Sequence, residues 1–166
     1  IIADNDDSKN TFRNIKTLLK DKRIHYIKTS NLSMVENWEF ARNAATGEYL
    51  TVLEDKQMFY PHALNTISNA LCHFENIEIL GWLPDRFSSH SPVLRRSKFA
   101  NSSYEIIDPK TIIFDSINNS FTDSIKLPRL INSVVSSKLI NRVIKKSNIN
   151  QFFHTISPDF TACFLT

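Results

Sequence analysis

Apolar positions along the first half of the chain fall into two kinds of pattern. Short continuous runs, bounded by polar turns, predict buried strands. Sets that recur every three or four residues predict helices. In chain order, strands and helices alternate over Ile1–Ala3, Thr11–Lys20, His25–Ile27, Met34–Ala45, Tyr49–Leu53, Pro61–Phe74 and Ile77–Trp82. This alternation predicts an α/β domain with a mostly parallel sheet and helices on both faces.

The second half of the chain has a less regular pattern, above all over Leu83–Asp123. Two short apolar runs in that stretch, Glu105–Ile107 and Thr111–Phe114, predict further strands. Apolar side chains then recur at helical spacing over Leu130–Ile144. This spacing predicts a long helix that ends near Ser147-Asn148.

Size and composition agree with one folded domain over 1–166. The chain has 166 residues, of which 42% are hydrophobic and 12 are Phe, and this excludes a disordered tail. No apolar run approaches the roughly 20 residues that cross a bilayer. The two cysteines, Cys72 and Cys163, are too few for a metal site, so we expect a reduced, intracellular protein. Because the sequence begins directly with an apolar strand, we also expect it to be a piece of a longer protein.

Charge is distributed unevenly along the chain. The formal net charge is +3, and no Asp or Glu lies between Ser124 and Pro158. The cations of that segment are Lys126, Arg129, Lys138, Arg142, Lys145 and Lys146. We expect either a solvated helix face or a peripheral contact of 126–146 with anionic lipid, at the inner membrane face of a cytoplasmic protein. The segment carries no nucleic-acid-binding motif, so nucleic acid is not an expected partner.

Carboxylates end two of the predicted strands. Asp4 follows Ile1–Ala3, and Glu54-Asp55 follows Tyr49–Leu53. In open parallel sheets, ligands bind beyond the carboxyl ends of the strands. A carboxylate there can accept hydrogen bonds from a base or ribose, or hold a divalent cation that bridges to phosphates. The alternative is that these acids only cap the helices that follow.

A series of short motifs runs along most of the chain. Its members are Ile1–Asn5, Asn37–Ala41, Ala45–Leu53, Pro61–Leu64, Leu127–Asn132, and Phe152–His154 with Ser157–Asp159. In their order and spacing they resemble family 2 glycosyltransferases, which have the GT-A fold and whose first strand would precede Ile1. The resemblance implies inverting transfer of a sugar from a nucleotide-diphosphate sugar to a hydroxyl of a glycan or lipid-linked acceptor, in surface polysaccharide or glycan synthesis. It makes 1–82 the nucleotide-sugar-binding part and 83–166 an acceptor-side part that is cut short.

The resemblance also implies roles for individual side chains. Asp4 would contact the nucleotide base. Asp55 matches the first acid of the family's Asp-x-Asp motif, which touches the ribose and helps to hold Mg²⁺ or Mn²⁺ on the diphosphate, and Gln57 stands where the second acid is expected. Lys56, between them, would neutralise part of the phosphate charge. Asp159 would be the general base that takes the proton from the acceptor hydroxyl, or else a helix N-cap.

The composition of this motif leaves the activity open. Gln57 can ligate a hard cation through its amide oxygen, but it brings one negative charge fewer than an acid. Lys56 can replace part of the cation's role, or it can mark a site that has decayed. The alternative to an enzyme is therefore a non-catalytic relative that binds a nucleotide or a glycan. A signalling receiver domain, with an acidic pocket at 4–7 and Asp55 as phospho-acceptor, disagrees with the length of the chain.

Overall fold

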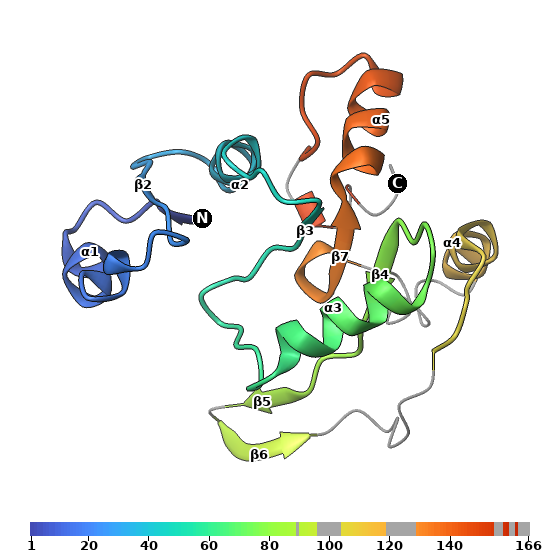
Figure 1. Ribbon diagram of the computed structural model, residues 1–166, viewed down its shortest axis with the longest axis horizontal. Helices are drawn as coiled ribbons and strands as arrows, with labels where there is room; N and C mark the ends of the chain where they lie inside the picture. The colour runs from blue at the N-terminus through green and yellow to red at the C-terminus, as the bar shows by residue number, and fades with distance from the viewer. Residues whose placement is uncertain (89, 96–103, 119–128, 155–157, 160–161, 163–166) are drawn as a thin grey trace. The chain divides into compact units, whose positions relative to one another are not determined.

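The computed structural model describes residues 1–88, 90–95, 104–118, 129–154, 158, 159 and 162. The chain divides into two compact units. The first unit contains Ile1–Leu50 and Ser136–Thr166, and the second contains Thr51–Val135 (Figure 1). The described residues form a mixed α/β structure with five α-helices and short strands. The expected α/β class is therefore confirmed at this level.

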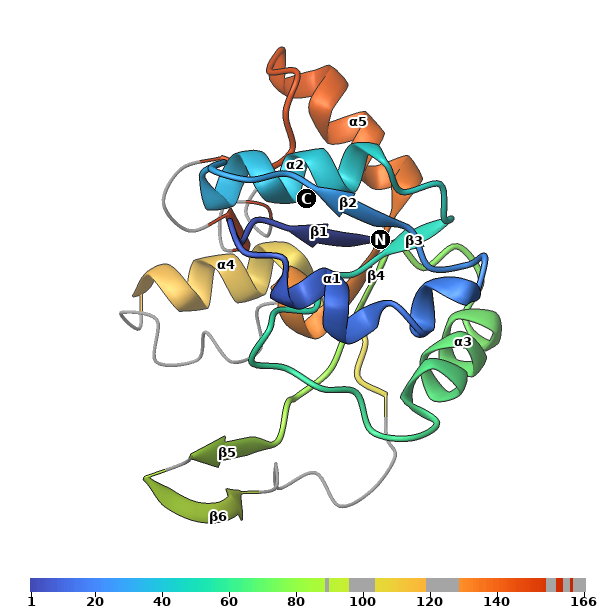
Figure 2. The same ribbon diagram turned by 90° about the vertical axis from the view of Figure 1, so that its left-hand side faces the viewer.

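A parallel pair of strands opens the first unit. β1 (Ile2–Asp4) pairs with β2 (Tyr26–Lys28), and the two lie side by side in Figure 2. The connection between them holds α1 (Asn10–Ile15) and the 3₁₀-helix η1 (Leu18–Lys20). The single helix predicted over Thr11–Lys20 is therefore two short helical pieces.

The helix α2 (Met34–Asn43) packs along β1 in the first unit. The Ser33 hydroxyl accepts a hydrogen bond from the Glu36 amide, and the Glu36 carboxylate accepts one from the Ser33 amide at 2.8 Å. This reciprocal capping box satisfies two amides that the start of a helix would otherwise leave unpaired. After α2 comes β3 (Tyr49–Leu50), which is shorter than the predicted strand.

The last described helix of the first unit is α5 (Ser137–Ser147). Its start is capped by the Ser136 hydroxyl, which accepts a hydrogen bond from the Leu139 amide at 3.1 Å. The helix ends at Asn148, which has a left-handed backbone with φ of 55°. The buried apolar residues of this part of the chain are Leu139, Ile140, Val143, Phe152, Phe153 and Ala162.

The second unit combines two helices with short strands. Its elements are α3 (Ala63–His73), β4 (Ile79–Gly81), β5 (Arg86–Ser88), β6 (Ser91–Arg95), α4 (Pro109–Asn118), the 3₁₀-helix η3 (Leu130–Asn132) and β7 (Ser133–Ser136, whose last residue belongs to the first unit). β4 and β7 pair antiparallel, with Leu80 opposite Val134. β5 and β6 form an antiparallel hairpin that follows β4 (Figure 1).

Strand pairing departs from the expected mostly parallel sheet. The ladder of β1 with β2 is parallel, whereas β4–β7 and β5–β6 are antiparallel. A connection as short as the one between β5 and β6 can only join antiparallel neighbours, because a parallel crossover needs a dozen or more residues. The stretch 83–95, which carried no prediction, supplies this hairpin.

Three local predictions were wrong, and two of the errors have a physical reason. The helix predicted over Leu130–Ile144 is instead η3, then β7, and then the start of α5. The strand forms because all four residues of Ser133–Ser136 are buried and the two central ones are β-branched valines. The strand predicted over Thr111–Phe114 lies inside α4. Pro109 starts that helix, and the Asp108 carboxylate accepts a hydrogen bond from the Thr111 hydroxyl at 2.9 Å. The run Glu105–Ile107 lies in no strand.

The described ranges also bear on the membrane and cysteine expectations. Within them, no helix is both long enough and apolar enough to cross a lipid bilayer. The Cys72 thiol is free and exposed on α3. Cys163, Lys126 and Ser157 lie outside the described residues.

Candidate functional site

Asp4 stands at the carboxyl end of β1, opposite Lys28 of β2. The residue is 5% exposed. Its Oδ2 accepts hydrogen bonds from the Tyr26 hydroxyl at 2.5 Å and from the Lys28 ammonium at 3.3 Å. Its Oδ1 accepts one from the Asp6 amide at 3.1 Å. Three donors therefore fix the position of a buried carboxylate at the end of a parallel strand.

These contacts change the protonation of the Asp4 cluster. Burial by itself raises the pKa of the Asp4 carboxyl. The hydrogen bonds from Tyr26, the Asp6 amide and Lys28, together with the Lys28 charge, outweigh burial and lower that pKa from its ordinary value of 3.8. In return, the hydrogen bond to Asp4 raises the pKa of the Tyr26 phenol to about 12. At neutral pH the cluster therefore holds the Asp4 carboxylate as an anion and the Tyr26 phenol as its donor.

The second predicted strand end is the turn Glu54–Gln57, in the second unit. The Gln57 side chain closes this turn, because its Oε1 accepts a hydrogen bond from the Glu54 amide at 3.1 Å. Its Nε2 donates to the Ile131 carbonyl at 3.2 Å, which ties the turn to η3. The side chains of Asp55 and Lys56 are both exposed. A neutral side chain thus holds the turn, and two charged ones stand at its surface.

Oxygen ligands for a cation are few at this turn. Asp55 offers an exposed carboxylate, and Gln57 Oε1 keeps one lone pair besides the one that accepts from Glu54. Across the part of the chain that the structure describes, no three His, Cys, Asp or Glu side chains gather closely enough to hold a metal. The donors at the turn fit a cation such as Mg²⁺, which takes one or two protein ligands and the rest from phosphates and water. They do not form a closed protein cage.

Asp159, the predicted general base, is a buried residue of the first unit. It is 5% exposed and follows Pro158, which is also buried. Both residues have a helical backbone, and both make contacts with other groups. The carboxylate is therefore part of the packed interior of that unit.

Glu39 is a buried carboxylate that the sequence pattern did not single out. From α2 its Oε2 accepts hydrogen bonds from the amides of Phe152 and Phe153, each at 3.1 Å. The Arg42 guanidinium donates to Oε1 through Nε at 2.9 Å and through a second nitrogen. The neighbouring Trp38 meets the Phe153 ring edge to face, with centroids 5.4 Å apart. Glu39 therefore fastens the segment that leads toward Asp159 onto α2. The signal for it is a lone acid between two aromatic residues in the middle of a predicted helix.

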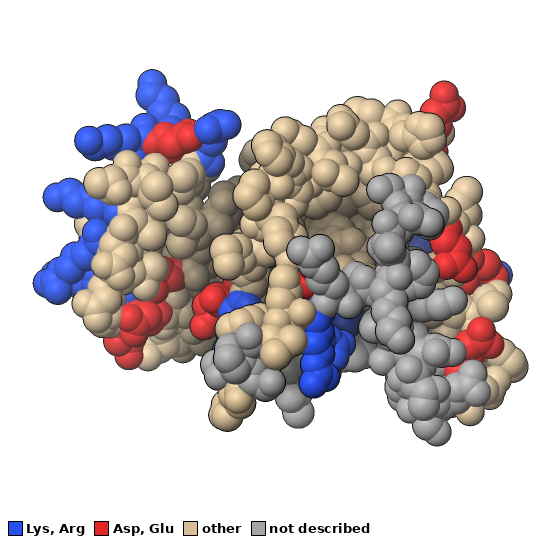
Figure 3. Space-filling view, turned by 90° about the horizontal axis from the view of Figure 1, so that it is seen from below, with Lys and Arg blue, Asp and Glu red and all other residues tan. Residues whose placement is uncertain are grey.

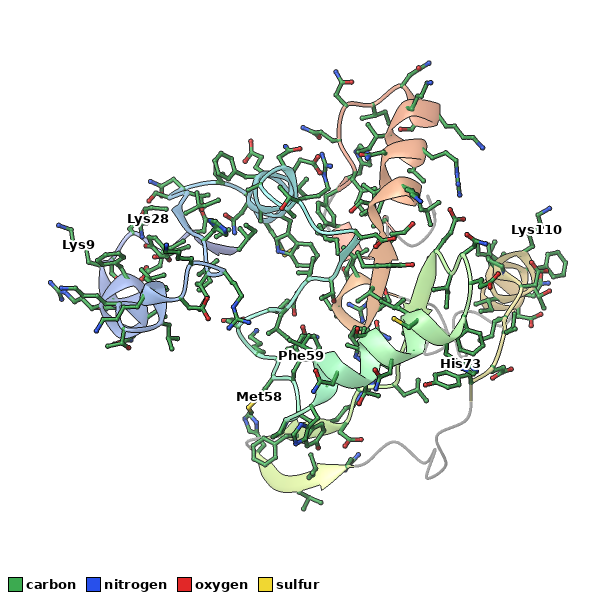
Figure 4. The ribbon with its side chains drawn as sticks, viewed as in Figure 1. Lys9, Lys28, Met58, Phe59, His73 and Lys110 are labelled. Atoms are coloured by element: carbon green, nitrogen blue, oxygen red, sulfur yellow. The ribbon has the colours of Figure 1, made fainter. Side chains whose placement is uncertain are left out.

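A second group of side chains that the pattern missed surrounds Trp82 in the second unit. The Trp82 amide donates to the Asn132 carbonyl, and Asn132 Nδ2 donates back to the Trp82 carbonyl, both at 2.9 Å. The Phe59 ring, labelled in Figure 4, lies 6.1 Å from that of Trp82 in an edge-on arrangement. Asn132 Oδ1 is buried and accepts no hydrogen bond from the residues that the structure describes. These contacts hold Asn132 beside Trp82, and the hydrogen bond from Gln57 to the Ile131 carbonyl joins the same segment to the Glu54–Gln57 turn.

The predicted site residues fall into both units. Asp4 and Asp159 belong to the first unit, and the turn with Asp55, Lys56 and Gln57 belongs to the second. Comparisons with protein-family models, curated proteins and solved structures found no match. What each side chain can do therefore rests on its own contacts and on the motifs in the sequence.

Proposed function

We propose that the chain is a glycosyltransferase of the GT-A type, which transfers a sugar with inversion from a nucleotide-diphosphate sugar to a hydroxyl of a glycan or lipid-linked acceptor. The observation that carries the proposal is the Glu54–Gln57 turn, which follows the end of β3 at Leu50. Gln57 fixes the turn from within, so Asp55 and Lys56 are presented at its surface without serving its fold. Fixed, exposed charges of both signs suit a ribose and a diphosphate, since little reorganisation is needed when the ligand binds.

Each predicted residue then has a task in this reaction. Asp55 accepts hydrogen bonds from the ribose, and Lys56 places its ammonium on the diphosphate as charge develops on the leaving group. Asp4 accepts from the base through Oδ1, which takes one hydrogen bond inside the protein, from the Asp6 amide. Asp159, a buried carboxylate of the first unit, receives the proton of the acceptor hydroxyl.

A divalent cation fits this scheme as a shared ligand of protein and diphosphate. Asp55 and Gln57 Oε1 would hold Mg²⁺ or Mn²⁺, and the cation would neutralise the departing diphosphate. Because only one of these two protein ligands carries charge, Lys56 takes a larger share of that neutralisation. We therefore expect binding to depend on the cation less steeply than it would with two carboxylates.

Calorimetry with UDP- and GDP-sugars in the presence of Mn²⁺ tests the proposed site. Asp55→Ala should weaken binding about ten- to a hundredfold, the effect of losing charge-assisted contacts. Asp115→Ala is the matched control, because it removes another exposed carboxylate of the second unit, on α4. Equal affinity for wild type and Asp55→Ala would show that the site is elsewhere.

A second candidate function is non-catalytic binding of a nucleotide or glycan. It is favoured by the use of Gln57, whose amide serves the turn through both of its polar atoms. Restoring the acids with Lys56→Asp and Gln57→Asp discriminates the two. Metal-dependent sugar release that appears only in the double variant identifies a decayed enzyme, whereas turnover by the wild type excludes this candidate.

A further inference from the structure

The stretch that carries α1 and η1 in the first unit is rich in cations. Between residues 9 and 23 there are six cations and one acid. In Figure 3, Lys and Arg side chains gather at the left-hand edge, the side on which α1 lies in Figure 1. We call the following residues the α1 surface: Lys9, Phe12, Arg13, Lys16, Leu18, Lys20 and Lys22.

Among the described residues, no acid forms an ion pair with the cations of the α1 surface. The one acid of the stretch, Asp21, pairs with Arg23 at 2.6 Å. The five cations of the α1 surface are all exposed, and the described part of the chain gives none of them an ion pair. Five unpaired charges on one short stretch create a local field that attracts an anionic partner.

Apolar side chains stand among these cations. Leu18 is 55% exposed and Phe12 is 40% exposed. The Phe12 ring rests against Tyr26, with centroids 5.3 Å apart, which fixes its position beside the charges. Large apolar groups exposed to water among cations are characteristic of helices that lie in the interface of a bilayer. A surface that binds only phosphate groups, as in nucleic acids, gains nothing from an exposed leucine side chain.

We propose that the α1 surface binds the surface of an anionic lipid bilayer, with its cations on the headgroups and Leu18 and Phe12 in the boundary with the acyl chains. The inference goes beyond sugar transfer and does not depend on it. It also moves the membrane contact away from 126–146, where the absence of acids had predicted it. α5, which carries part of that segment, turns Leu139, Ile140 and Val143 into the core and keeps Lys145 and Lys146 exposed.

Flotation with phosphatidylserine–phosphatidylcholine vesicles tests the proposal, with pure phosphatidylcholine vesicles as the reference. The protein should float with the anionic vesicles only, and less so as salt is raised. Lys16→Gln with Lys20→Gln should lower partitioning about thirtyfold, from the usual contribution of two cations near such a surface. Lys145→Gln with Lys146→Gln is the matched control and should change it less than about threefold.

A second pair of variants tests the apolar part of the contact. Leu18→Ser should lower partitioning about tenfold, because it removes an apolar side chain from the interface. Leu64→Ser, an equally accessible leucine of α3 at 63% exposure, should leave it unchanged.

Three results would overturn the proposal. The first is equal partitioning onto neutral and anionic vesicles, or none onto either. The second is a loss from the α5 variant as large as that from the Lys16 and Lys20 variant. The third is an unchanged vesicle affinity of Leu18→Ser together with binding of a single-stranded oligonucleotide that needs the same cations, which would identify a nucleic-acid surface.

Discussion

In the first unit the residues Asp4, Glu39 and Asp159 are each no more than 6% exposed, whereas in the second unit Asp55 is exposed to solvent. Asp4 and Asp55 nevertheless follow the same kind of sequence, an apolar run that ends in an acid. Asp4 is held by three donors, while the turn that carries Asp55 is held by the amide of Gln57.

This difference separates two uses of a charged residue. At Asp4 and Glu39 of the first unit the charge is part of the fold, because removing it leaves its hydrogen-bond donors without an acceptor. In the second unit a neutral amide does the structural work, and the charge remains available to a ligand. The position of an acid at a strand end therefore does not by itself distinguish a structural carboxylate from one that binds a substrate.

The largest effect that tests this comparison is expected at Glu39. Glu39→Ala removes the acceptor of the Phe152 and Phe153 amides and leaves Arg42 without its buried partner. We expect the free energy of unfolding to fall by about 3 kcal/mol, measured by urea denaturation. Glu48→Ala, an exposed acid of the same unit, should change it by less than about 0.5 kcal/mol. Similar values for the two variants would contradict a structural role for the buried charge.

The next effect concerns Asp4 and its dependence on pH. Because the folded-state pKa of Asp4 is lowered, its contribution is complete above the ordinary pKa of 3.8 and is lost as the pH falls from there through the folded pKa. Asp4→Asn should lower the free energy of unfolding by about 2 kcal/mol at neutral pH and flatten its dependence on acid pH.

A spectroscopic titration of tyrosine gives an independent measurement of the same cluster. The Tyr26 pKa of about 12 should fall toward its ordinary value of 10.0 in Asp4→Asn, because the acceptor charge is gone. If the free energy of unfolding of Asp4→Asn depends on acid pH as it does in wild type, and Tyr26 titrates as in wild type, then Asp4 does not interact with its neighbours.

Much of the local structure could be predicted from sequence, and the failures have a common cause. α2 and α3 carry strong local signals, namely helical spacing and clear ends, and both were found within a few residues. β7 was missed because Val134 and Val135 fit helical spacing with the residues around them. What makes them a strand is pairing with β4, some 50 residues away, which no local pattern contains.

Asp4 lies at the end of β1, as the pattern predicts, whereas β3 ends at Leu50, before the Glu54–Gln57 turn. The acids at the ends of β1 and of the run Tyr49–Leu53 could be located from pattern alone. That Tyr26 and Lys28 surround Asp4 depends on the register of β2 against β1. That Gln57 binds the turn to Ile131 depends on a contact across 74 residues. Contacts between distant segments therefore decide which acid is buried.

Gln57→Glu tests whether the neutral side chain of Gln57 holds the Glu54–Gln57 turn. A glutamate can still accept from the Glu54 amide, but it cannot donate to the Ile131 carbonyl. We expect the free energy of unfolding to fall by about 1 kcal/mol, while affinity for Mn²⁺, followed by calorimetry, rises because a second carboxylate joins Asp55. Gln151→Glu adds the same charge at an exposed position. It should change neither the free energy of unfolding nor the affinity for Mn²⁺. A rise in stability would show that the Gln57 amide does not hold the turn.

The smallest effect on stability, and the most telling one, is expected at Asp55. If the turn is held by Gln57, Asp55→Ala should change the free energy of unfolding by less than about 0.5 kcal/mol. The control Asp115→Ala should also change it by less than about 0.5 kcal/mol, and urea denaturation measures both variants. A loss above about 1 kcal/mol at Asp55 alone would mean that this acid, like Asp4, belongs to the fold. Asp4 and Asp55 would then differ only in exposure, and the case for a ligand at the Glu54–Gln57 turn would lose its main support. An unchanged stability combined with lost binding of nucleotide-sugar is the outcome that separates a carboxylate kept for a ligand from one kept for the structure.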